Sequence, residues 1–183
     1  MTFSKTRPVD VSSIFNGCKL LANVDLHCLD GCKVNNFSEA FSSCKNLKSL
    51  DLTKIDFSSC GGYTGTFENC SSLTTLDVSN FCWKNVSGEC VWTFQGCTSL
   101  KEINLGEFYI AKAKRLENFF ANCTSLEKLD YSRFDINVEN ISGFFRGCSS
   151  LKNINVDHFV TSETYEIGGI FSACSSLESI DLS

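Results

Sequence analysis

The sequence lacks the features of membrane-spanning and nucleic-acid-binding proteins. It contains no stretch of about 18 consecutive apolar residues, so we expect no transmembrane helix and no membrane insertion. Its 16 lysines and arginines are outnumbered by 21 aspartates and glutamates, giving a formal net charge of −5, which argues against a nucleic-acid partner. The one basic run, Lys112, Lys114 and Arg115, is typical of a solvated turn.

Catalytic and metal-binding motifs are also missing. The chain has no G-x-S-x-G nucleophile elbow, no H-E-x-x-H metal motif and no phosphate-binding loop. It has two histidines: His27 lies near Cys28 and Cys32 without a C-x-x-C pair to complete a zinc site, and His158 has no partner in the sequence. We therefore expect a protein that is not an enzyme, with no catalytic residues, no metal site and no cofactor.

The beginning of the chain, MTFSKTRPVDVSS, has no apolar segment of the kind that a secretory signal peptide contains. Two interpretations remain open: a cytoplasmic protein, or a trimmed piece of a cell-surface or secreted protein. If its many cysteines are unpaired, they favour a reducing or anaerobic setting.

The composition is biased in a way that is typical of repeats, with one proline, sixteen phenylalanines and twelve cysteines. Seven cysteines recur at intervals of 25 to 27 residues: Cys18, Cys44, Cys70, Cys97, Cys123, Cys148 and Cys174. A phenylalanine stands three residues before each of them, and a leucine stands three residues after. The full pattern is F-x-x-C-x-x-L-x-x-L-D-L-S-x-x-F.

Two spacings within the repeat predict its local structure. The L-x-L part alternates with period two, which predicts a short strand with one buried face. Before the cysteine, apolar residues such as Ile141, Phe144 and Phe145 are spaced i, i+3 and i+4, which predicts one or two helical turns. One such repeat cannot bury its apolar side alone, but stacked repeats form a continuous core.

The repeat resembles the leucine-rich repeats of about 26 residues in BspA-like bacterial surface proteins. The segments FRGCSSLKNINV and FSACSSLESIDLS match that unit closely, whereas residues 28–36 and the glycine-rich FSSCGGYTGTF depart from it. The resemblance implies a non-catalytic module displayed on a cell surface or secreted, used for adhesion or for recognition of a protein or glycan ligand. An intracellular protein-interaction scaffold is an alternative.

We therefore expect an α/β solenoid in which residues 1–183 form a single leucine-rich-repeat domain. Seven repeats would wind as a right-handed coil, with a parallel sheet on one face and short α-helical or 3-10 segments on the other. Neighbouring strands in such a sheet lie about 4.8 Å apart.

The middle residue of L-x-L points away from the core, so this column and its neighbours are the candidate binding residues of the concave face. They are Asp25, Asp51, Asp77, Asn104, Asp130, Asn155, Asp181, Glu102 and Lys128. One interpretation is a ladder of carboxylates about 5 Å apart that a ligand or cation bridges. The other is that each aspartate accepts a hydrogen bond from the residue two positions on. We favour the second, because no repeat has the spacing of a calcium loop.

The seven periodic cysteines suit a tight, buried turn, and we interpret them as a reduced structural ladder. Parallel side chains about 4.8 Å apart are too distant for the roughly 3.8 Å between Cβ atoms of a relaxed disulfide. The other five are Cys28, Cys32, Cys60, Cys82 and Cys90. Cys32 and Cys60 occupy similar places on neighbouring repeats and are candidates for pairing, but free thiols in loops are the favoured interpretation.

Three aromatic residues are candidate ligand anchors. Trp83 and Tyr109 follow the strand segment and are expected in exposed loops, whereas Trp92 stands two residues before Phe94 and is expected to be half-buried. Packing into the core is the alternative for each of them.

The two ends of the sequence are complementary, because the final SIDLS followed by the initial MTF continues the repeat pattern. Neither end shows a polar capping element, and the last strand, residues 177–182, would leave an open edge. A piece of a longer array is one interpretation. A structural solenoid that self-associates end to end through its terminal repeats is the other.

Overall fold

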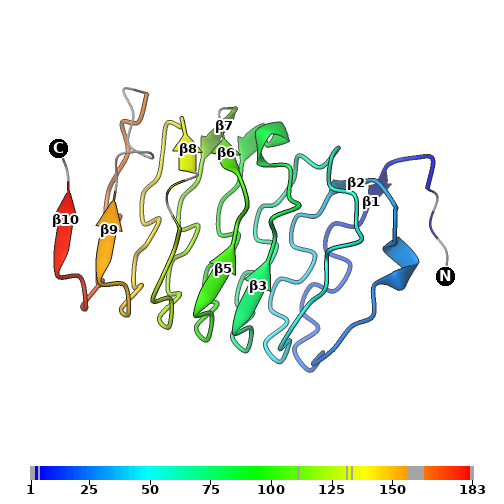
Figure 1. Ribbon diagram of the computed structural model, residues 1–183, viewed down its shortest axis with the longest axis horizontal. Coiled ribbons are helices and arrows are strands. Elements are labelled where there is room, and N and C mark those ends of the chain that lie inside the picture. Colours follow the sequence, from blue (N-terminus) through cyan, green and yellow to red (C-terminus); the bar gives the residue numbers. More distant parts are fainter. Residues whose placement is uncertain are drawn as a thin grey trace.

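The computed structural model describes residues 3, 5–110, 112–130, 132, 134–155 and 163–181. It is an elongated coil of stacked repeats, with the two ends of the chain at opposite ends of the stack (Figure 1). The seven periodic cysteines take successive places along it, and six turns of the coil separate the first from the last. The predicted solenoid of stacked repeats with parallel strands is therefore confirmed.

The elements are short and follow one another at the repeat period. The strands are β1 (Val9–Asp10), β2 (Val34–Asn36), β3 (Thr75–Asp77), β4 (Gly88–Glu89), β5 (Glu102–Asn104), β6 (Phe108–Ile110), β7 (Ala113–Arg115), β8 (Phe134–Ile136), β9 (Asn153–Asn155) and β10 (Ser179–Asp181). Two 3-10 helices, η1 (His27–Leu29) and η2 (Trp83–Asn85), complete the described elements.

Strands form where L-x-L predicts them in four repeats. β3 pairs in parallel with β5, with Leu76 opposite Ile103, and β9 pairs with β10, with Ile154 opposite Ile180. The equivalent residues 23–25, 49–51 and 128–130 are not strands. The row of L-x-L segments runs along one side of the coil in Figure 1.

Several turns of the coil also carry strand pairing that the sequence did not predict. β6 pairs with β8, and the pairs β1–β2 and β4–β7 form a third parallel column. Isolated bridges extend that third column, joining Arg115 to Asn140 and Asn140 to Glu166. The coil therefore has three strand-bearing sides.

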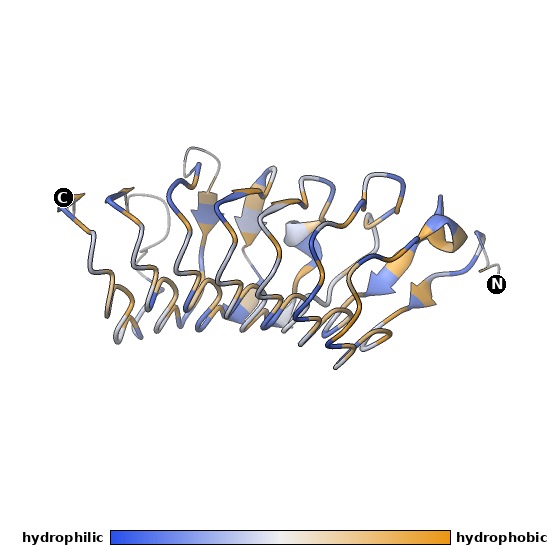
Figure 2. Ribbon diagram, turned by 90° about the horizontal axis from the view of Figure 1, so that it is seen from below, coloured by the Kyte–Doolittle hydropathy of each residue, from blue (hydrophilic) through white to orange (hydrophobic). Residues whose placement is uncertain are grey.

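The segment before each cysteine differs from the prediction, because it is a pair of tight turns and not a helix. Gln95 N–H donates to the carbonyl of Trp92 (3.1 Å) and Cys97 N–H to that of Phe94 (3.2 Å), both i+3 contacts. The N–H groups that alternate with these donate to carbonyls of the next coil, as Phe94 N–H does to the carbonyl of Phe119 (2.9 Å). A helix would use all of these donors internally. Seen from below in Figure 2, the turns stack into a continuous row.

Two left-handed positions in each repeat enforce these turns. Five residues before the cysteine φ is positive at Ser13, Glu39, Gly65, Trp92, Asn118, Gly143 and Gly169. One residue before the cysteine it is positive at Gly17, Ser43, Asn69, Gly96, Asn122, Gly147 and Ala173. Positive φ is incompatible with a right-handed helix and is the signature of the third residue of a type II turn.

The core is organised around a stack of phenylalanine rings that runs through the whole coil. Its members are Phe15, Phe41, Phe67, Phe94, Phe120, Phe145 and Phe171. Successive ring centroids lie 5.2 to 6.2 Å apart, and the rings are nearly parallel. The five inner rings are fully buried, whereas the terminal Phe15 and Phe171 are half-buried.

Candidate functional site

The periodic cysteines join neighbouring coils through their thiols. Cys97 Sγ donates to the carbonyl of Phe67 (3.1 Å), and Cys123 Sγ donates in the same way to Phe94 (3.1 Å). The same contact, at 3.1 to 3.2 Å, recurs for Cys44, Cys70, Cys148 and Cys174. Cys18, in the first coil, is exposed. The ladder is thus a column of buried donors that satisfies carbonyl groups of the turns.

Burial raises the pKa of these thiols. It raises the pKa of Cys97 and of Cys148 to about 12, and the pKa of Cys123 well above its usual value. A neutral thiol is the form that donates a hydrogen bond and is also the unreactive form. The ladder therefore has a structural role.

The remaining cysteines correct one prediction. All twelve cysteines are free thiols, but Cys32, Cys60 and Cys90 are buried in the core and do not lie in exposed loops. Cys28 and Cys82 are half-buried. Cys60 Sγ lies 3.5 Å from the carbonyl of Gly62, which is a contact within its own coil, and the candidate Cys32–Cys60 pair is not formed.

The acidic column of the L-x-L face mainly accepts hydrogen bonds from its own turns. A carboxylate or amide oxygen accepts the N–H two residues on, at 2.9 to 3.1 Å, in Asp25, Asp51, Asp77, Asn104 and Asp130. Hydrogen bonds from Thr53 lower the pKa of Asp51, and hydrogen bonds from Ser79 lower that of Asp77. This is the second of the two interpretations. Among the described residues no group of His, Cys, Asp or Glu is arranged to hold a metal ion.

The other predicted concave residues are placed as follows. Glu102 and Lys128 are exposed. Asn155 and Asp181 face one another in the register of β9 and β10. His158 lies outside the described residues.

The structure shows a second column of polar side chains, which the sequence analysis did not predict. Eight residues before the cysteine, Asp10 and Asn36 hydrogen-bond across neighbouring coils (3.3 Å), as Glu89 and Arg115 do (2.7 Å). Arg115 also pairs with the buried Glu117, whose other oxygen has no hydrogen-bond partner among the described residues. The recurrence of Asp, Asn and Glu at this position was the available signal.

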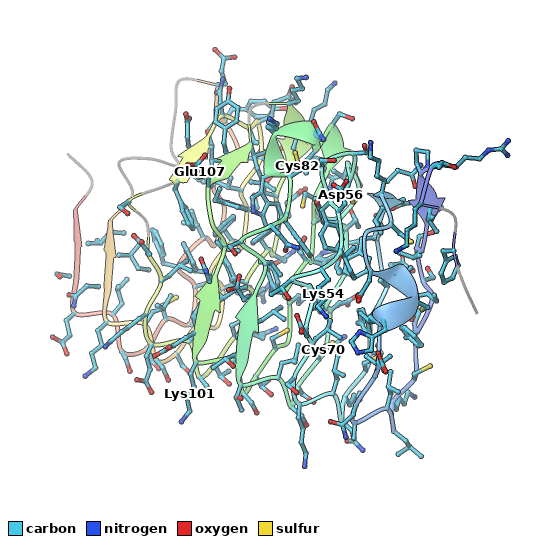
Figure 3. All side chains as sticks on the ribbon, turned by 45° about the vertical axis from the view of Figure 1, so that its right-hand side comes forward. Lys54, Asp56, Cys70, Cys82, Lys101 and Glu107 are labelled. Atoms are coloured by element: carbon cyan, nitrogen blue, oxygen red, sulfur yellow. The ribbon has the colours of Figure 1, made fainter. Side chains whose placement is uncertain are left out.

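A candidate site is a groove of about 550 Å³ at the ends of the L-x-L segments. It is lined by three stretches from consecutive coils: residues 55–58, residues 79–84, and Glu107 with Tyr109. The labelled Asp56, Cys82 and Glu107 lie at this side of the coil in Figure 3, away from Cys70 and Lys101. Its volume falls within the range of ligand-binding clefts, about 300–1,000 Å³.

Hydrogen bonds hold the walls of the groove in place. Asn80 Nδ2 donates to the carbonyl of Leu52 (2.8 Å), and Trp83 Nε1 donates to that of Leu105 (2.9 Å). Cys82 N–H donates to the hydroxyl of Tyr63 (3.0 Å). Groups fixed in this way are preorganised, so a ligand pays little to order them.

The three aromatic residues predicted as ligand anchors have different positions in the structure. Trp83 is only 1% exposed and belongs to the core, which overturns its predicted loop position, because its ring packs against Tyr63, Phe81 and Phe108. Tyr109 is 45% exposed, because the middle residue of β6 points outward. Trp92 is partly exposed on its turn, in agreement with the sequence.

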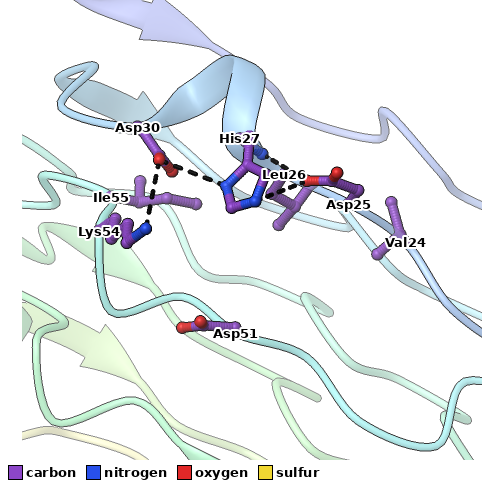
Figure 4. A pocket seen from close by; sticks show the side chains of 8 residues that line it. All are labelled: Val24, Asp25, Leu26, His27, Asp30, Asp51, Lys54 and Ile55. Atoms are coloured by element: carbon purple, nitrogen blue, oxygen red, sulfur yellow. Dashed lines mark hydrogen bonds and ion pairs between the residues drawn. The ribbon is translucent and has the colours of Figure 1, made fainter.

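A smaller hollow of about 260 Å³ adjoins the groove through the shared Ile55 (Figure 4). His27 lies between two carboxylates, with Nδ1 3.4 Å from Asp30 and Nε2 3.8 Å from Asp25. Lys54 Nζ lies 3.8 Å from Asp30. The hollow is thus a charged extension of the groove.

The described part of the chain has no helix long and apolar enough to cross a membrane. A comparison with curated proteins finds no match. A solved structure that is similar is that of a leucine rich cell surface protein from Faecalibacterium prausnitzii A2-165, at 16% identity and a TM-score of 0.42, covering 93% of this chain and 75% of that one.

Two family models match the chain, each over slightly more than half of its length. The model for the BspA type leucine rich repeat region matches residues 11–106. The model described as Mycoplasma protein of unknown function, DUF285, matches residues 88–182. The chain therefore belongs to the BspA-type leucine-rich-repeat family and, through its second half, to the DUF285 family.

Proposed function

We propose that the protein is a non-catalytic recognition module that binds a partner protein through the groove formed by residues 55–58, 79–84 and 107–109. The groove carries this proposal, because it combines an apolar floor, an exposed aromatic wall and unpaired charges. Recognition sites are typically concave, largely apolar and provided with a few fixed polar groups. The L-x-L face beside it lacks aromatic or arginine anchors and contributes mainly charge.

We place this module at the cell surface or in a secreted protein, where its recognition serves adhesion. Membership of the BspA-type family supports this location. The absence of catalytic motifs from the sequence supports a binding function over an enzymatic one.

Replacing Tyr109 by alanine is expected to weaken partner binding about tenfold, because exposed tyrosines at the centre of an interface supply much of its binding energy. The measurement is surface plasmon resonance of the chain over immobilised extracellular-matrix proteins and glycans. Tyr165→Ala is the matched control, since Tyr165 is also exposed and lies outside the groove lining. Equal loss in both variants would place the site elsewhere, and no binding to any surface would contradict adhesion.

The alternative function is self-assembly, and the two ends of the coil support it. In inner coils the N–H groups of Gly143, Phe145 and Gly147 donate to the following coil. The equivalent groups of Gly169, Phe171 and Ala173 donate to no carbonyl among the described residues. At the other end, the carbonyls of Ser12, Ile14 and Asn16 accept none there.

Apolar side chains accompany these open backbone groups. Leu20 is 85% exposed in the first coil, and Ile167 is half-exposed in the last described one. Stacking the last coil of one copy on the first coil of another would repeat the contact made between inner coils, a head-to-tail contact that does not close.

Self-assembly predicts that the mass of the purified chain, measured by light scattering under reducing conditions, grows with concentration. Ile167→Lys is expected to abolish the growth, because it places a charge in the contact. A constant monomer mass across the concentration range would contradict self-assembly. The recognition module would then be the remaining proposal.

A further inference from the structure

Resting on the proposed recognition function, we infer that the groove takes an extended basic segment of a partner protein, with one apolar side chain seated between Tyr109 and the groove floor. The floor is apolar, since Ile55, Phe57 and Phe81 line it and are almost completely buried. Tyr109 forms a wall that remains accessible. An apolar side chain entering here removes its own surface and that of Tyr109 from water.

The charge around the groove selects the partner. Ten charged residues line the groove and the three neighbouring hollows on the same side of the coil. They are Asp25, Asp30, Asp51, Asp56, Asp77, Glu102, Glu107, Asp130, Lys54 and Lys84. Eight carboxylates against two lysines give this surface a formal charge of −6, compared with −5 for the whole chain. The groove lining itself has a formal charge of −1, and most of this negative charge lies in the hollows beside the groove.

The carboxylates are spread along the coil, and this arrangement favours several separate cationic side chains over one metal ion. Asp51 gives one oxygen to its own turn and, among the described residues, has no hydrogen bond on the other. Asp77 also gives one oxygen to its own turn, and its other oxygen accepts a hydrogen bond from Asn104 Nδ2 in the next coil (3.2 Å). Neighbouring coils repeat at about 4.8 Å, while side chains on one face of an extended peptide repeat at roughly 6.6 Å. Flexible lysine and arginine side chains accommodate that mismatch.

Two charges inside the groove are available for this contact. Glu107 and Lys84 have no ion-pair or hydrogen-bond partner for their side chains among the described residues. Glu107 is a site for a cation of the partner, whereas Lys84 opposes it. Complementary charge of this kind raises the rate of association and excludes acidic partners.

The test uses a blocked peptide of about seven residues, roughly 23 Å when extended, with lysines flanking one central phenylalanine. Calorimetric titration of the full chain is expected to give binding that weakens about tenfold when salt rises from about 0.05 M to about 0.5 M. Two matched peptides, with glutamate in place of lysine or alanine in place of phenylalanine, are expected to bind at least about tenfold more weakly.

Two variants locate the contact. Lys84→Glu is expected to tighten binding of the lysine peptide severalfold, and Glu107→Lys is expected to weaken it about tenfold. Equal binding of the lysine and glutamate peptides, or no change in either variant, would overturn the inference. If a matrix protein binds in a Tyr109-dependent manner while the lysine peptide does not bind, only the basic-segment inference fails. If neither binds, the proposed function fails as well.

Discussion

Raising the pH from 8 to about 10.5 is expected to unfold the protein. Burial holds the pKa of Cys90, Cys97 and Cys148 at about 12, and raises that of Cys70 and Cys123 far above its usual value. In the unfolded chain the same thiols lose their protons near pH 8.5. Above that pH the unfolded state binds fewer protons than the native state, so stability falls as pH rises.

The size of this effect follows from the number of buried thiols. Each one costs about 1.4 kcal/mol for every pH unit between its unfolded and its folded pKa. Five thiols together cost about 7 kcal/mol per pH unit, which is comparable with the 5–15 kcal/mol total stability of a typical domain. Their contribution is fully present below about pH 8.5 and is lost progressively above it.

Urea titrations at several pH values, with reductant present and tryptophan fluorescence as readout, give the slope of unfolding free energy against pH. Cys97→Ala is expected to reduce that slope by about 1.4 kcal/mol per pH unit, because one buried thiol is removed. Cys18→Ala is the matched control, since Cys18 is exposed. A protein that stays folded with unchanged stability at pH 11 would contradict the buried ladder.

Replacing Phe120 by alanine is expected to cost about 3–5 kcal/mol of unfolding free energy. Its ring is fully buried and stacks on Phe94 at 5.3 Å and on Phe145 at 5.8 Å. Its loss therefore removes two stacking contacts and leaves a cavity at the centre of the coil. In a solenoid, where each coil contacts only its neighbours, such a gap weakens the coupling between the two halves.

The control for this prediction is the same substitution at the end of the stack. Phe171 is half-buried and stacks on Phe145 at 6.2 Å. Phe171→Ala is expected to cost about 1–2 kcal/mol, in proportion to its burial. Both variants are compared by urea denaturation monitored by circular dichroism. Equal losses at Phe120 and Phe171 would show that the stack is not the continuous core described here.

The coil and its core were predictable because they depend on periods within one repeat. The alternation of Leu76 and Val78 around Asp77 predicts a strand with an outward carboxylate, and β3 has that form. The phenylalanine three residues before each cysteine predicts a stacked core in the same way. Such columns repeat along the chain, so each copy reinforces the inference.

The turns before the cysteine were not predicted, because the apolar spacing of i, i+3 and i+4 suits a helix and a pair of tight turns equally well. The signal that distinguishes the two was the glycine or asparagine directly before the cysteine. Positive φ occurs there at Gly17, Asn69, Gly96, Asn122 and Gly147. Asparagine and glycine are the residues that tolerate that conformation.

The groove also could not be predicted from the sequence, because its residues come from three coils whose side chains meet only after the coils stack. Tyr109 and Trp83 were both expected in exposed loops, with packing into the core as the alternative; Tyr109 is exposed, whereas Trp83 is in the core. Trp83 is buried because its ring packs against other aromatic rings of the core. Its indole N–H donates to the carbonyl of Leu105, which lies 22 residues away in the next coil. No local pattern reports such a partner.

The most direct test of the recognition site uses the two tryptophans of the chain as reporters. Trp83 lines the groove, whereas Trp92 lies on a turn that does not. Each tryptophan gives one indole N–H signal in a nitrogen–proton NMR spectrum, and the lysine peptide is added while both are followed. The account predicts a shift of the Trp83 signal and a stationary Trp92 signal. A shift of Trp92 with Trp83 unmoved would place binding on the turns and contradict the groove.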